Sequence, residues 1–277
     1  MMNILITGGA GYIGSVLVPL LLEYNYNITV VDNYMYKQTS LLDVCHNKNL
    51  KIIKEDVLNH SVLKKYVQAH DVIIPLAGIV GAPSCEKNKK MATEINQLQV
   101  KYIVETMSSK QRIILPVTNS GYGVGLKDQY CDETSPLNPI SHYGITKVES
   151  EKYIMDRDNS ISLRLATVFG ASPRMRIDLL VNDFVHRAIT EGYIILFESH
   201  FKRNYIHVRD VCYTIIHCLD NFDEMKNEIY NVGLSDANLS KLELCLKIKS
   251  HLNNLKIIES NIAEDPDKRN YIVSNKK

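Results

Sequence analysis

Several features are missing from this chain of 277 residues, and each absence narrows what it can be. No apolar run approaches the roughly 20 residues that a helix needs to cross a bilayer, so no membrane association is expected. The formal net charge is only +1, which gives no reason to expect a nucleic acid partner. The N-terminus reads directly as a strand and does not resemble a signal peptide.

The six cysteines are scattered and form no C-x-x-C pair. This pattern argues against a disulfide framework and against a zinc site, and no metal site is expected. Reduced thiols are typical of the cytoplasm, where we therefore expect the protein. Internal repeats and low-complexity tracts are also lacking, whereas the 45% hydrophobic and 23% charged content is ordinary for a folded globular protein.

What the sequence does contain, as far as Gly170, is a regular alternation of apolar strands and helices. Strands that are apolar throughout and separated by helices indicate a parallel sheet covered on both faces, which is a doubly wound α/β (Rossmann) fold. The expected strands span residues 3–7, 27–32, 51–54, 71–75, 112–117 and 161–165. The expected helices span residues 12–24, 40–47, 60–68, 86–107 and 141–156.

The pattern becomes more irregular after Gly170. We therefore divide the chain into a Rossmann domain, residues 1–170, and a smaller, interleaved α/β lobe, residues 171–277, of which about 204–232 return to the first domain. Ser240 and Glu243 predict a capping box before a further helix. The other elements expected in this part are helices at 178–191 and 209–219 and strands at 193–197, 204–208 and 228–232.

Residues 7–14, T-G-G-A-G-Y-I-G, lie between the first strand and the first helix. Gly8 would make the tight turn, Gly11 would let phosphates approach the backbone, and Gly14 would let the helix pack closely on the sheet. The helix N-terminus itself attracts an anion. The alternative is a tight turn that binds nothing, but the flanking strand and helix favour a dinucleotide site.

Polar or small residues also follow the next strands. Asp32 ends the second strand, where a carboxylate would accept hydrogen bonds from the adenosine ribose. Residues 33–36 after it contain no basic residue for a 2′-phosphate, so NAD is favoured over NADP. Asp56 and Val57 could clamp the adenine, and residues 76–78 (Leu76, Ala77 and Gly78) could let the backbone pass the phosphates. Each group alone is more often just a strand end, but ligands bind at this edge of open α/β sheets.

Tyr143 and Lys147 are four residues apart and share one face of a predicted helix. A lysine ammonium and a positively charged nicotinamide would stabilise the phenolate and lower its pKa, so Tyr143 could take a proton from a substrate hydroxyl. Thr118, or Ser120 instead, could hold that hydroxyl at the end of the fifth strand. Chance explains a Y-x-x-x-K motif about as often as function, and a Ser/Gly turn explains residues 118–123 equally simply.

Taken together these motifs resemble the extended short-chain dehydrogenase/reductase family, in its nucleotide-sugar branch, over essentially the whole chain. The resemblance rests on residues 7–14, Asp32, Asp56–Val57, Leu76–Gly78, Asn96, T-N-S-G-Y-G at 118–123, Tyr143 with Lys147, R-L-A-T-V-F-G at 164–170 and R-N-Y-I-H-V-R-D at 203–210. It implies an NAD-binding first domain, a substrate-binding second lobe, and a homodimer or homotetramer that pairs through two long helices.

The resemblance also implies residue roles. Thr118, Tyr143 and Lys147 take the catalytic positions. The cofactor is implied to contact Gly8, Gly11, Tyr12, Ile13, Gly14, Asp32, Asn33, Asp56, Val57, Leu76, Ala77, Gly78 and Asn96, together with Tyr143 and Lys147. A nucleotide-diphosphate sugar is implied to contact Thr118, Asn119, Thr167, Arg174, Asn182, Arg203 and Arg269, in which an arginine suits a diphosphate by its fork of donors.

One departure restricts the reaction. Family members that dehydrate the sugar usually carry Asp-Glu directly after the catalytic threonine, but Asn119 and Ser120 stand here. An amide and a hydroxyl serve poorly as the acid and base of an elimination. The sequence therefore argues against a 4,6-dehydratase.

Three reactions then remain for a sugar oxidised at C4: release of the ketone by a dehydrogenase, return of hydride to the other face by an epimerase, and the reverse reaction of a ketone reductase. Residues 79–85, beside the expected nicotinamide position, are similar to those of GDP-heptose 4-dehydrogenases of capsular polysaccharide synthesis, which makes oxidation the leading hypothesis. Two readings from other classes stay open, namely a non-catalytic NAD(H)-binding sensor and a small-molecule ketone or steroid reductase.

Overall fold

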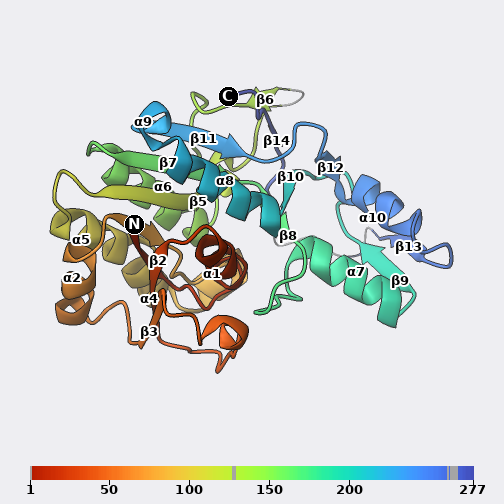
Figure 1. Ribbon diagram of the computed structural model, residues 1–277. Coiled ribbons are helices and arrows are strands. Elements are labelled where there is room, and N and C mark those ends of the chain that lie inside the picture. The colour runs from red at the N-terminus through yellow and green to blue at the C-terminus, as the bar shows by residue number, and fades with distance from the viewer. Residues whose placement is uncertain (1, 127–128, 261, 263–267) are drawn as a thin grey trace.

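The computed structural model describes residues 2–126, 129–260, 262 and 268–277. Its centre is a sheet of seven parallel strands in the order β11-β7-β5-β4-β1-β2-β3 (Figure 1). The strands are β1 (Asn3–Thr7), β2 (Asn27–Asp32), β3 (Leu50–Lys54), β4 (Val72–Pro75), β5 (Arg112–Thr118), β7 (Ser160–Leu165) and β11 (Glu228–Val232). The predicted doubly wound α/β fold is confirmed.

Strand periodicity explains why both faces of the sheet are covered. In β1, Ile4 and Ile6 point to one face and Leu5 to the other, and all three are fully buried. The first face packs against α1 (Gly14–Glu23) and α8 (Val208–Asp220). The second packs against α2 (His60–Gln68), α5 (Gln99–Thr106) and α6 (His142–Met155). Each such buried aliphatic side chain contributes about 1.5–3 kcal/mol relative to an exposed one.

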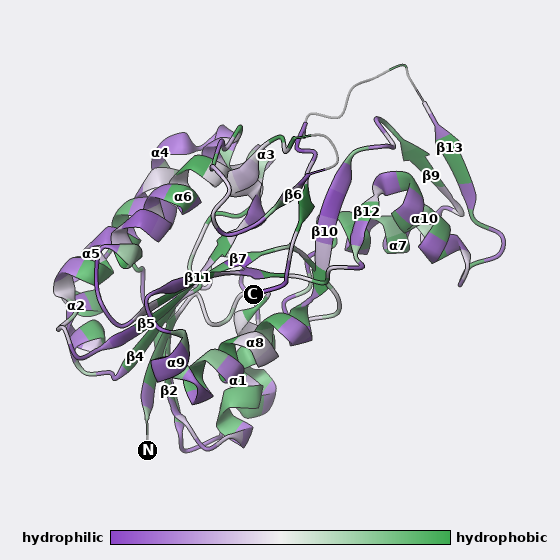
Figure 2. Ribbon diagram, turned by 90° about the horizontal axis from the view of Figure 1, so that it is seen from above, coloured by the Kyte–Doolittle hydropathy of each residue, from purple (hydrophilic) through white to green (hydrophobic). Residues whose placement is uncertain are grey.

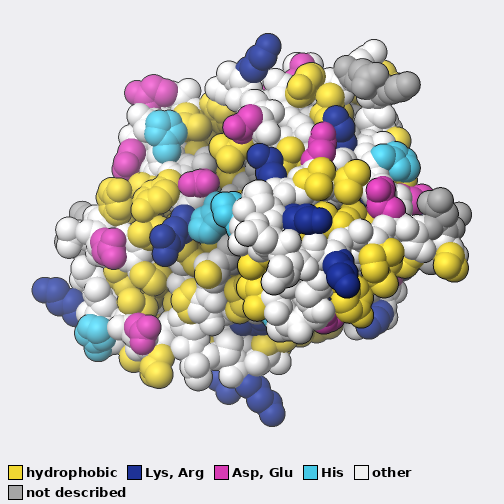
Figure 3. Space-filling model, turned by 90° about the vertical axis from the view of Figure 1, so that its right-hand side faces the viewer, with side chains coloured by type: hydrophobic (Ala, Val, Ile, Leu, Met, Phe, Trp, Pro, Cys, Tyr) yellow, Lys and Arg dark blue, Asp and Glu magenta, His cyan; other side chains and the backbone are white. Residues whose placement is uncertain are grey.

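A smaller lobe lies beside the carboxyl edge of the sheet (Figures 1 and 2). Its core is formed by apolar side chains of α7 (Leu180–Thr190), β9 (Tyr193–Leu196) and α10 (Lys241–Lys249). Strand β13 (Lys256–Glu259) pairs in parallel with β9. Strand β10 (Lys202–His207) joins this lobe to the rest through β8 (Thr167–Phe169) and β12 (Asn238–Ser240). Figure 3 faces this side and shows separate apolar groups among Lys and Arg side chains.

Several predicted boundaries need correction. The helix expected over 86–107 is divided into α3 (Ala82–Lys87), α4 (Lys89–Thr93), a π-helical turn (Glu94–Leu98) and α5. The helix expected over 40–47 is a 3₁₀ turn, Leu42–Val44. The sequence did not predict six short elements, namely α9 (Phe222–Met225), β6 (Tyr130–Cys131), β14 (Ile272–Val273), β8, β12 and β13. The predicted capping box of α10 is confirmed, because Ser240 and Glu243 exchange both hydrogen bonds.

The described residues contain no helix that is both long and apolar enough to cross a membrane.

Candidate active site

The glycine turn between β1 and α1 needs its glycines for close packing. Gly8 has a φ of 69°, and a Cβ there would lie 2.5 Å from the backbone nitrogen of Ala77. A Cβ on Gly14 would lie 2.4 Å from the carbonyl oxygen of Gly9. Gly14 therefore lets the helix approach the turn itself, whereas the sequence had predicted an approach to the sheet.

Asp32 ends β2 next to this turn. One carboxylate oxygen accepts from the backbone N–H of Ala10 at 3.1 Å, and the other accepts from that of Tyr34 at 2.8 Å. Burial raises the pKa of Asp32, and the backbone donors partly offset the rise. Asn33 donates to Asp56 at 3.1 Å, so these two predicted residues lie together beyond the strand ends. An acceptor placed beside backbone N–H groups is what a dinucleotide requires, so these residues fit NAD.

The loop after β4 passes close to Lys147. A Cβ on Gly78 would lie 3.0 Å from Asn96 Oδ1 and 3.9 Å from Lys147 Nζ. Asn96 holds the loop by accepting from the Ile79 N–H at 2.8 Å and donating to the Ile79 carbonyl at 2.9 Å. Lys147 itself has no hydrogen bond or ion pair with any described residue.

Helix α6 begins at His142 because the Ser141 hydroxyl accepts from the Gly144 N–H at 3.1 Å. This start places Tyr143 in the first turn, where its hydroxyl shares a hydrogen bond with Thr118. The Thr118 hydroxyl donates to Ser120 Oγ at 2.9 Å, and Arg269 also donates to Ser120. The structure thus places Tyr143 beside both Thr118 and Ser120, which the sequence had offered as alternatives for holding the substrate hydroxyl.

Without a bound cofactor, the pKa of Tyr143 is raised above its ordinary value. Burial raises its pKa to about 12, and only the charges of Arg176 and Arg269 and the hydrogen bond with Thr118 lower it again. Burial also lowers the pKa of Lys147 to about 8. The lowering of the Tyr143 pKa that the sequence predicted depends on the positive charge of a bound nicotinamide as well as on Lys147, and it stays a prediction.

A family model described as "NAD dependent epimerase/dehydratase family" matches residues 4–233. The chain belongs to this family. Its members are enzymes of the extended short-chain dehydrogenase/reductase type, so the predicted resemblance, the enzyme class and the NAD cofactor are confirmed.

Relatives of known name agree with this assignment. The chain is 28% identical over 240 residues to a putative UDP-glucose 4-epimerase of Methanocaldococcus jannaschii, covering 83% of this chain and 76% of the relative. It is 27% identical to UDP-glucuronic acid decarboxylase 3 of Arabidopsis thaliana, covering 100% and 82%. The structure of a UDP-glucose 4-epimerase of Thermotoga maritima superposes with a TM-score of 0.84 at 25% identity, covering 99% and 90%.

In this family member the residues predicted to bind substrate are spread over several elements. Thr167 begins β8 opposite Tyr205, and Arg203, 4% exposed, lies over the Tyr271 ring at 5.5 Å. Asn182 accepts from the Gly170 N–H at 3.0 Å. The side-chain amide of Asn119 is buried and has no hydrogen-bond partner among the described residues.

Two arginines of the segment before α7 have surroundings that the sequence did not indicate. Arg174, predicted to contact substrate, lies over the ring of Tyr36 at 4.4 Å, on the loop that follows β2. Arg176 was not predicted at all, yet its charge acts on both Tyr143 and Tyr12. Its side chain is 17% exposed and pairs with Asp178. No sequence signal marked Arg176, because only the fold brings its segment to Tyr143.

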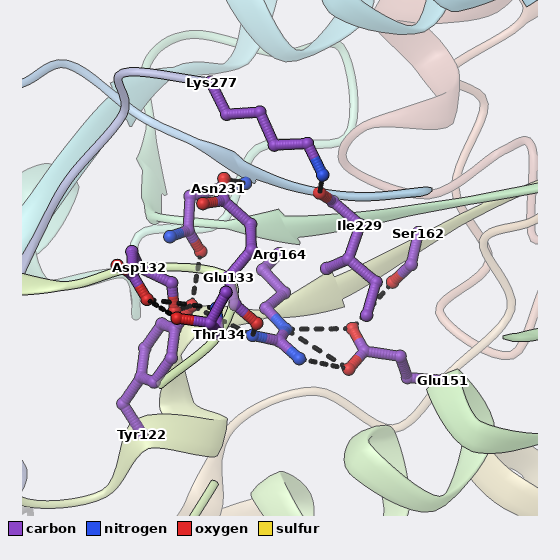
Figure 4. Close-up of polar contacts among 10 residues, drawn as sticks. All are labelled: Tyr122, Asp132, Glu133, Thr134, Glu151, Ser162, Arg164, Ile229, Asn231 and Lys277. Atoms are coloured by element: carbon purple, nitrogen blue, oxygen red, sulfur yellow. Dashed lines mark hydrogen bonds and ion pairs between the residues drawn. The ribbon is translucent and has the colours of Figure 1, made fainter. Parts of the chain in front are cut away.

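The same helix carries a second buried charge, Glu151, one turn beyond Lys147 (Figure 4). Glu151 forms an ion pair with Arg164 at 2.6 Å, and the two side chains are 6% and 5% exposed. The carboxylate also accepts from the Ser162 hydroxyl at 2.7 Å, and Arg164 donates to the Tyr122 hydroxyl at 3.0 Å. This network fixes α6 against β7 and so positions Tyr143.

A hollow of about 580 Å³ at the opposite edge of the sheet is a poorer candidate. It lies at the N-terminal ends of the strands, and several of its polar side chains are already hydrogen-bonded. Both ring nitrogens of His70 are hydrogen-bonded, to the Tyr66 carbonyl and the Thr29 hydroxyl. Gln111 donates to the carbonyls of Val67 and His70. Ligands of open α/β sheets bind at the other edge, where Tyr143 lies.

Proposed function

We propose that this protein oxidises the C4 hydroxyl of a nucleotide-activated sugar and returns the hydride to the opposite face, as a nucleotide-sugar 4-epimerase does. The observation that carries the proposal is the hydrogen-bonded pair of Thr118 and Tyr143, with Lys147 beside Gly78 at the carboxyl edge of the sheet. The 4-epimerase names of a relative and of a structural neighbour support the same reaction.

Each residue of the site has a separate role in the proposed reaction. Thr118 and Tyr143 hold the substrate hydroxyl between them, and Tyr143 accepts its proton. NAD, when bound, supplies the acceptor for the hydride that leaves the same carbon. The ammonium of Lys147 is buried without a partner, so it can donate to the nicotinamide ribose and favour the Tyr143 phenolate. Asp32 at the end of β2 holds the adenosine ribose.

The charge around the site suits a diphosphate. Arg269 reaches Ser120, and Arg176 and Arg269 both act on Tyr143. Arg203 lies on β10 over Tyr271. Guanidinium groups bind phosphate oxygens through paired N–H donors, which supports a nucleoside diphosphate as the handle of the substrate.

Replacing Tyr143 by Phe tests the mechanism. UDP-glucose and UDP-galactose, and then GDP-linked sugars, are incubated with the protein, and the products are separated by chromatography. We expect Tyr143→Phe to lower turnover about 10²- to 10⁴-fold, because general-base catalysis is lost. Tyr153→Phe is the matched control, since Tyr153 lies on the same helix and its hydroxyl only accepts from Gln97. Full turnover in the Tyr143 variant would refute the mechanism.

A GDP-heptose 4-dehydrogenase of capsular polysaccharide synthesis is the second candidate. The observation that favours it is the segment of residues 79–85, which ends in α3 and in which the buried Cys85 thiol donates to the Ile79 carbonyl at 3.2 Å and lies near Asn96. A dehydrogenase forms one keto-sugar and one NADH per turnover, measured by absorbance at 340 nm. A 4-epimerase interconverts two sugars without net NADH. A protein that binds NADH but turns over no sugar would instead be a sensor.

We also propose a cytoplasmic homodimer or homotetramer that pairs through the helices around α5 and α6. Leu98, which ends the π-helical turn before α5, and Ile145 on α6 are 46% and 44% exposed, which leaves apolar surface for a second copy. Light scattering during gel filtration measures the mass. A protein that runs as a monomer at micromolar concentration would contradict this proposal.

A further inference from the structure

In the segment between β8 and α7, residues 171–178, side chains that face the protein alternate with side chains that face solvent. Ser172, Arg174 and Arg176 are half-buried, whereas Met175 and Ile177 are 36% and 42% exposed. Such alternation is typical of an extended chain with one face on the protein. In Figure 1 this segment, which we call the strap, runs from β8 toward α1 and the loop after β2.

The strap is fastened to the start of α1, directly after the glycine turn. Ser172 Oγ donates to the Tyr12 carbonyl at 2.7 Å and lies 2.9 Å from Ser15 Oγ. The backbone N–H of Arg174 donates to Ser15 Oγ at 3.3 Å. At the root of the strap, the Tyr12 hydroxyl donates to the Gly170 carbonyl at 2.6 Å. The first half of the strap is therefore held on the helix that would carry the cofactor phosphates.

The strap is fastened a second time, to the loop after β2. The guanidinium of Arg174 lies over the Tyr36 ring, with 4.4 Å between the guanidinium carbon and the ring centroid. That loop is itself bound to the glycine turn, because the Ser40 hydroxyl donates to the Ala10 carbonyl at 2.7 Å. It also contacts Asp32, to which Gln38 donates at 3.4 Å. The strap, α1 and the loop thus form a closed ring of contacts around the turn.

We propose that Arg174 and Tyr36 form a clasp that closes the strap beside bound NAD, so that the cofactor is retained through many turnovers. The glycine turn and Asp32, which would hold the dinucleotide, lie inside this ring of contacts, so its release would require the ring to open. The contact is the weakest link of the ring, because Tyr36 is 57% exposed and a single cation–π pair joins the two sides.

This inference rests on the NAD cofactor and not on the proposed sugar chemistry. If NAD is retained, each hydride taken from a substrate must be returned before the next substrate is oxidised, unless a second substrate accepts it at the same site. Retention therefore favours a redox-neutral reaction such as epimerisation. Arg174 then acts on the cofactor side of the site, whereas the family resemblance assigned it to the substrate.

The test is the rate at which NAD leaves the protein. The NAD-loaded protein is diluted into alcohol dehydrogenase with ethanol, which converts released NAD to NADH that is followed at 340 nm. No sugar is present, so failure of the proposed function does not affect the result. Arg174→Ala and Tyr36→Ala are expected to speed release about three- to thirtyfold each, which is the range that a cation–π contact supports.

Two further measurements make the result specific. The double variant should release NAD no faster than the faster single variant, because both substitutions remove the same contact. Met35→Ala and Met175→Ala, the exposed neighbours of the two residues, should release NAD at the wild-type rate. The proposal is overturned if the wild-type protein loses NAD during desalting, if the single variants release at its rate, or if their effects add. An Arg174 variant that raises only the substrate KM would likewise assign the residue to the substrate.

Discussion

Helix α6 carries two buried charges, one turn apart, whose surroundings differ. Glu151 has Arg164 and Ser162 within hydrogen-bond distance, so its charge is fully compensated. Lys147 has no partner among the described residues, and burial lowers its pKa to about 8. An uncompensated buried charge costs stability, and such groups cluster at functional sites. The comparison separates a half of the helix whose charge is compensated within the protein from a half that fits the proposed cofactor contact.

Removing the compensated charge should have the largest effect on stability. Glu151→Ala leaves Arg164 buried and unpaired, and we expect a loss of about 3–5 kcal/mol in the free energy of unfolding. The measurement is urea denaturation followed by circular dichroism. A loss below 1 kcal/mol would mean that water reaches Arg164 and that the network does not position α6.

Removing the uncompensated charge should change the free energy of unfolding in the opposite direction. We expect Lys147→Met to stabilise the NAD-free protein at pH 7, on the order of 1–3 kcal/mol, while abolishing turnover. The pKa of Lys147 is lowered in the folded wild-type protein. Between about pH 8 and 10.5 the unfolded chain therefore binds more protons than the folded protein does, and the free energy of unfolding of the wild type rises with pH over that window. Melting temperatures of both proteins across pH 7–10.5 test the stabilisation at pH 7 and the pH dependence. The melting temperature of the variant should lack the increase with pH that is due to Lys147.

A smaller effect is expected at the edge of the network. Tyr122→Phe removes the hydroxyl that accepts from Arg164 and lies 2.7 Å from Asn231 Oδ1. We expect a loss of about 1–2 kcal/mol, because hydrogen-bond partners of the hydroxyl are left buried. Turnover per folded molecule should be unchanged. A large fall in turnover with unchanged stability would place Tyr122 in the catalytic group instead.

The smallest effect is expected at Glu149, two residues before Glu151. Its ion pair with Lys152 measures 2.6 Å, like that of Glu151, but the two side chains are 35% and 62% exposed. Glu149→Ala should change the free energy of unfolding by less than about 0.5 kcal/mol, because water screens the pair. It is the matched control for Glu151→Ala. Equal losses at the two positions would show that burial does not cause the difference.

Local patterns in the sequence predicted the Tyr143 and Lys147 end of α6 but not the network around Glu151. Tyr143 and Lys147 were found because four residues on a helix always share a face. The glycine turn and Asp32 were found because strand, turn and helix follow each other directly. The roles of these residues in binding and catalysis stay predictions, although the structure gathers them at one edge of the sheet.

The partners of Glu151 were not predicted because only the packing of α6 on β7 brings Ser162 and Arg164, 11 and 13 residues further along the chain, to its carboxylate. Arg164 had been noted only as part of a family motif, and Tyr122 only as part of a glycine turn. The clasp of Tyr36 with Arg174 escaped prediction for the same reason, since 138 positions separate the two residues. Pairing of short strands such as β9 with β13 depends on the small lobe that surrounds them, so their own sequence carries little signal.

The π-helical turn at Glu94–Leu98 has a consequence for comparing this chain with its relatives. A π turn amounts to the insertion of one residue into an α-helix, so the residues on its two sides are rotated by about 100° relative to a continuous helix. Deleting one residue there would regularise the helix, but it would also turn Asn96 away from Ile79 and from the loop beside Lys147. An alignment that closes a one-residue gap at this point would pair core positions with surface positions throughout α5.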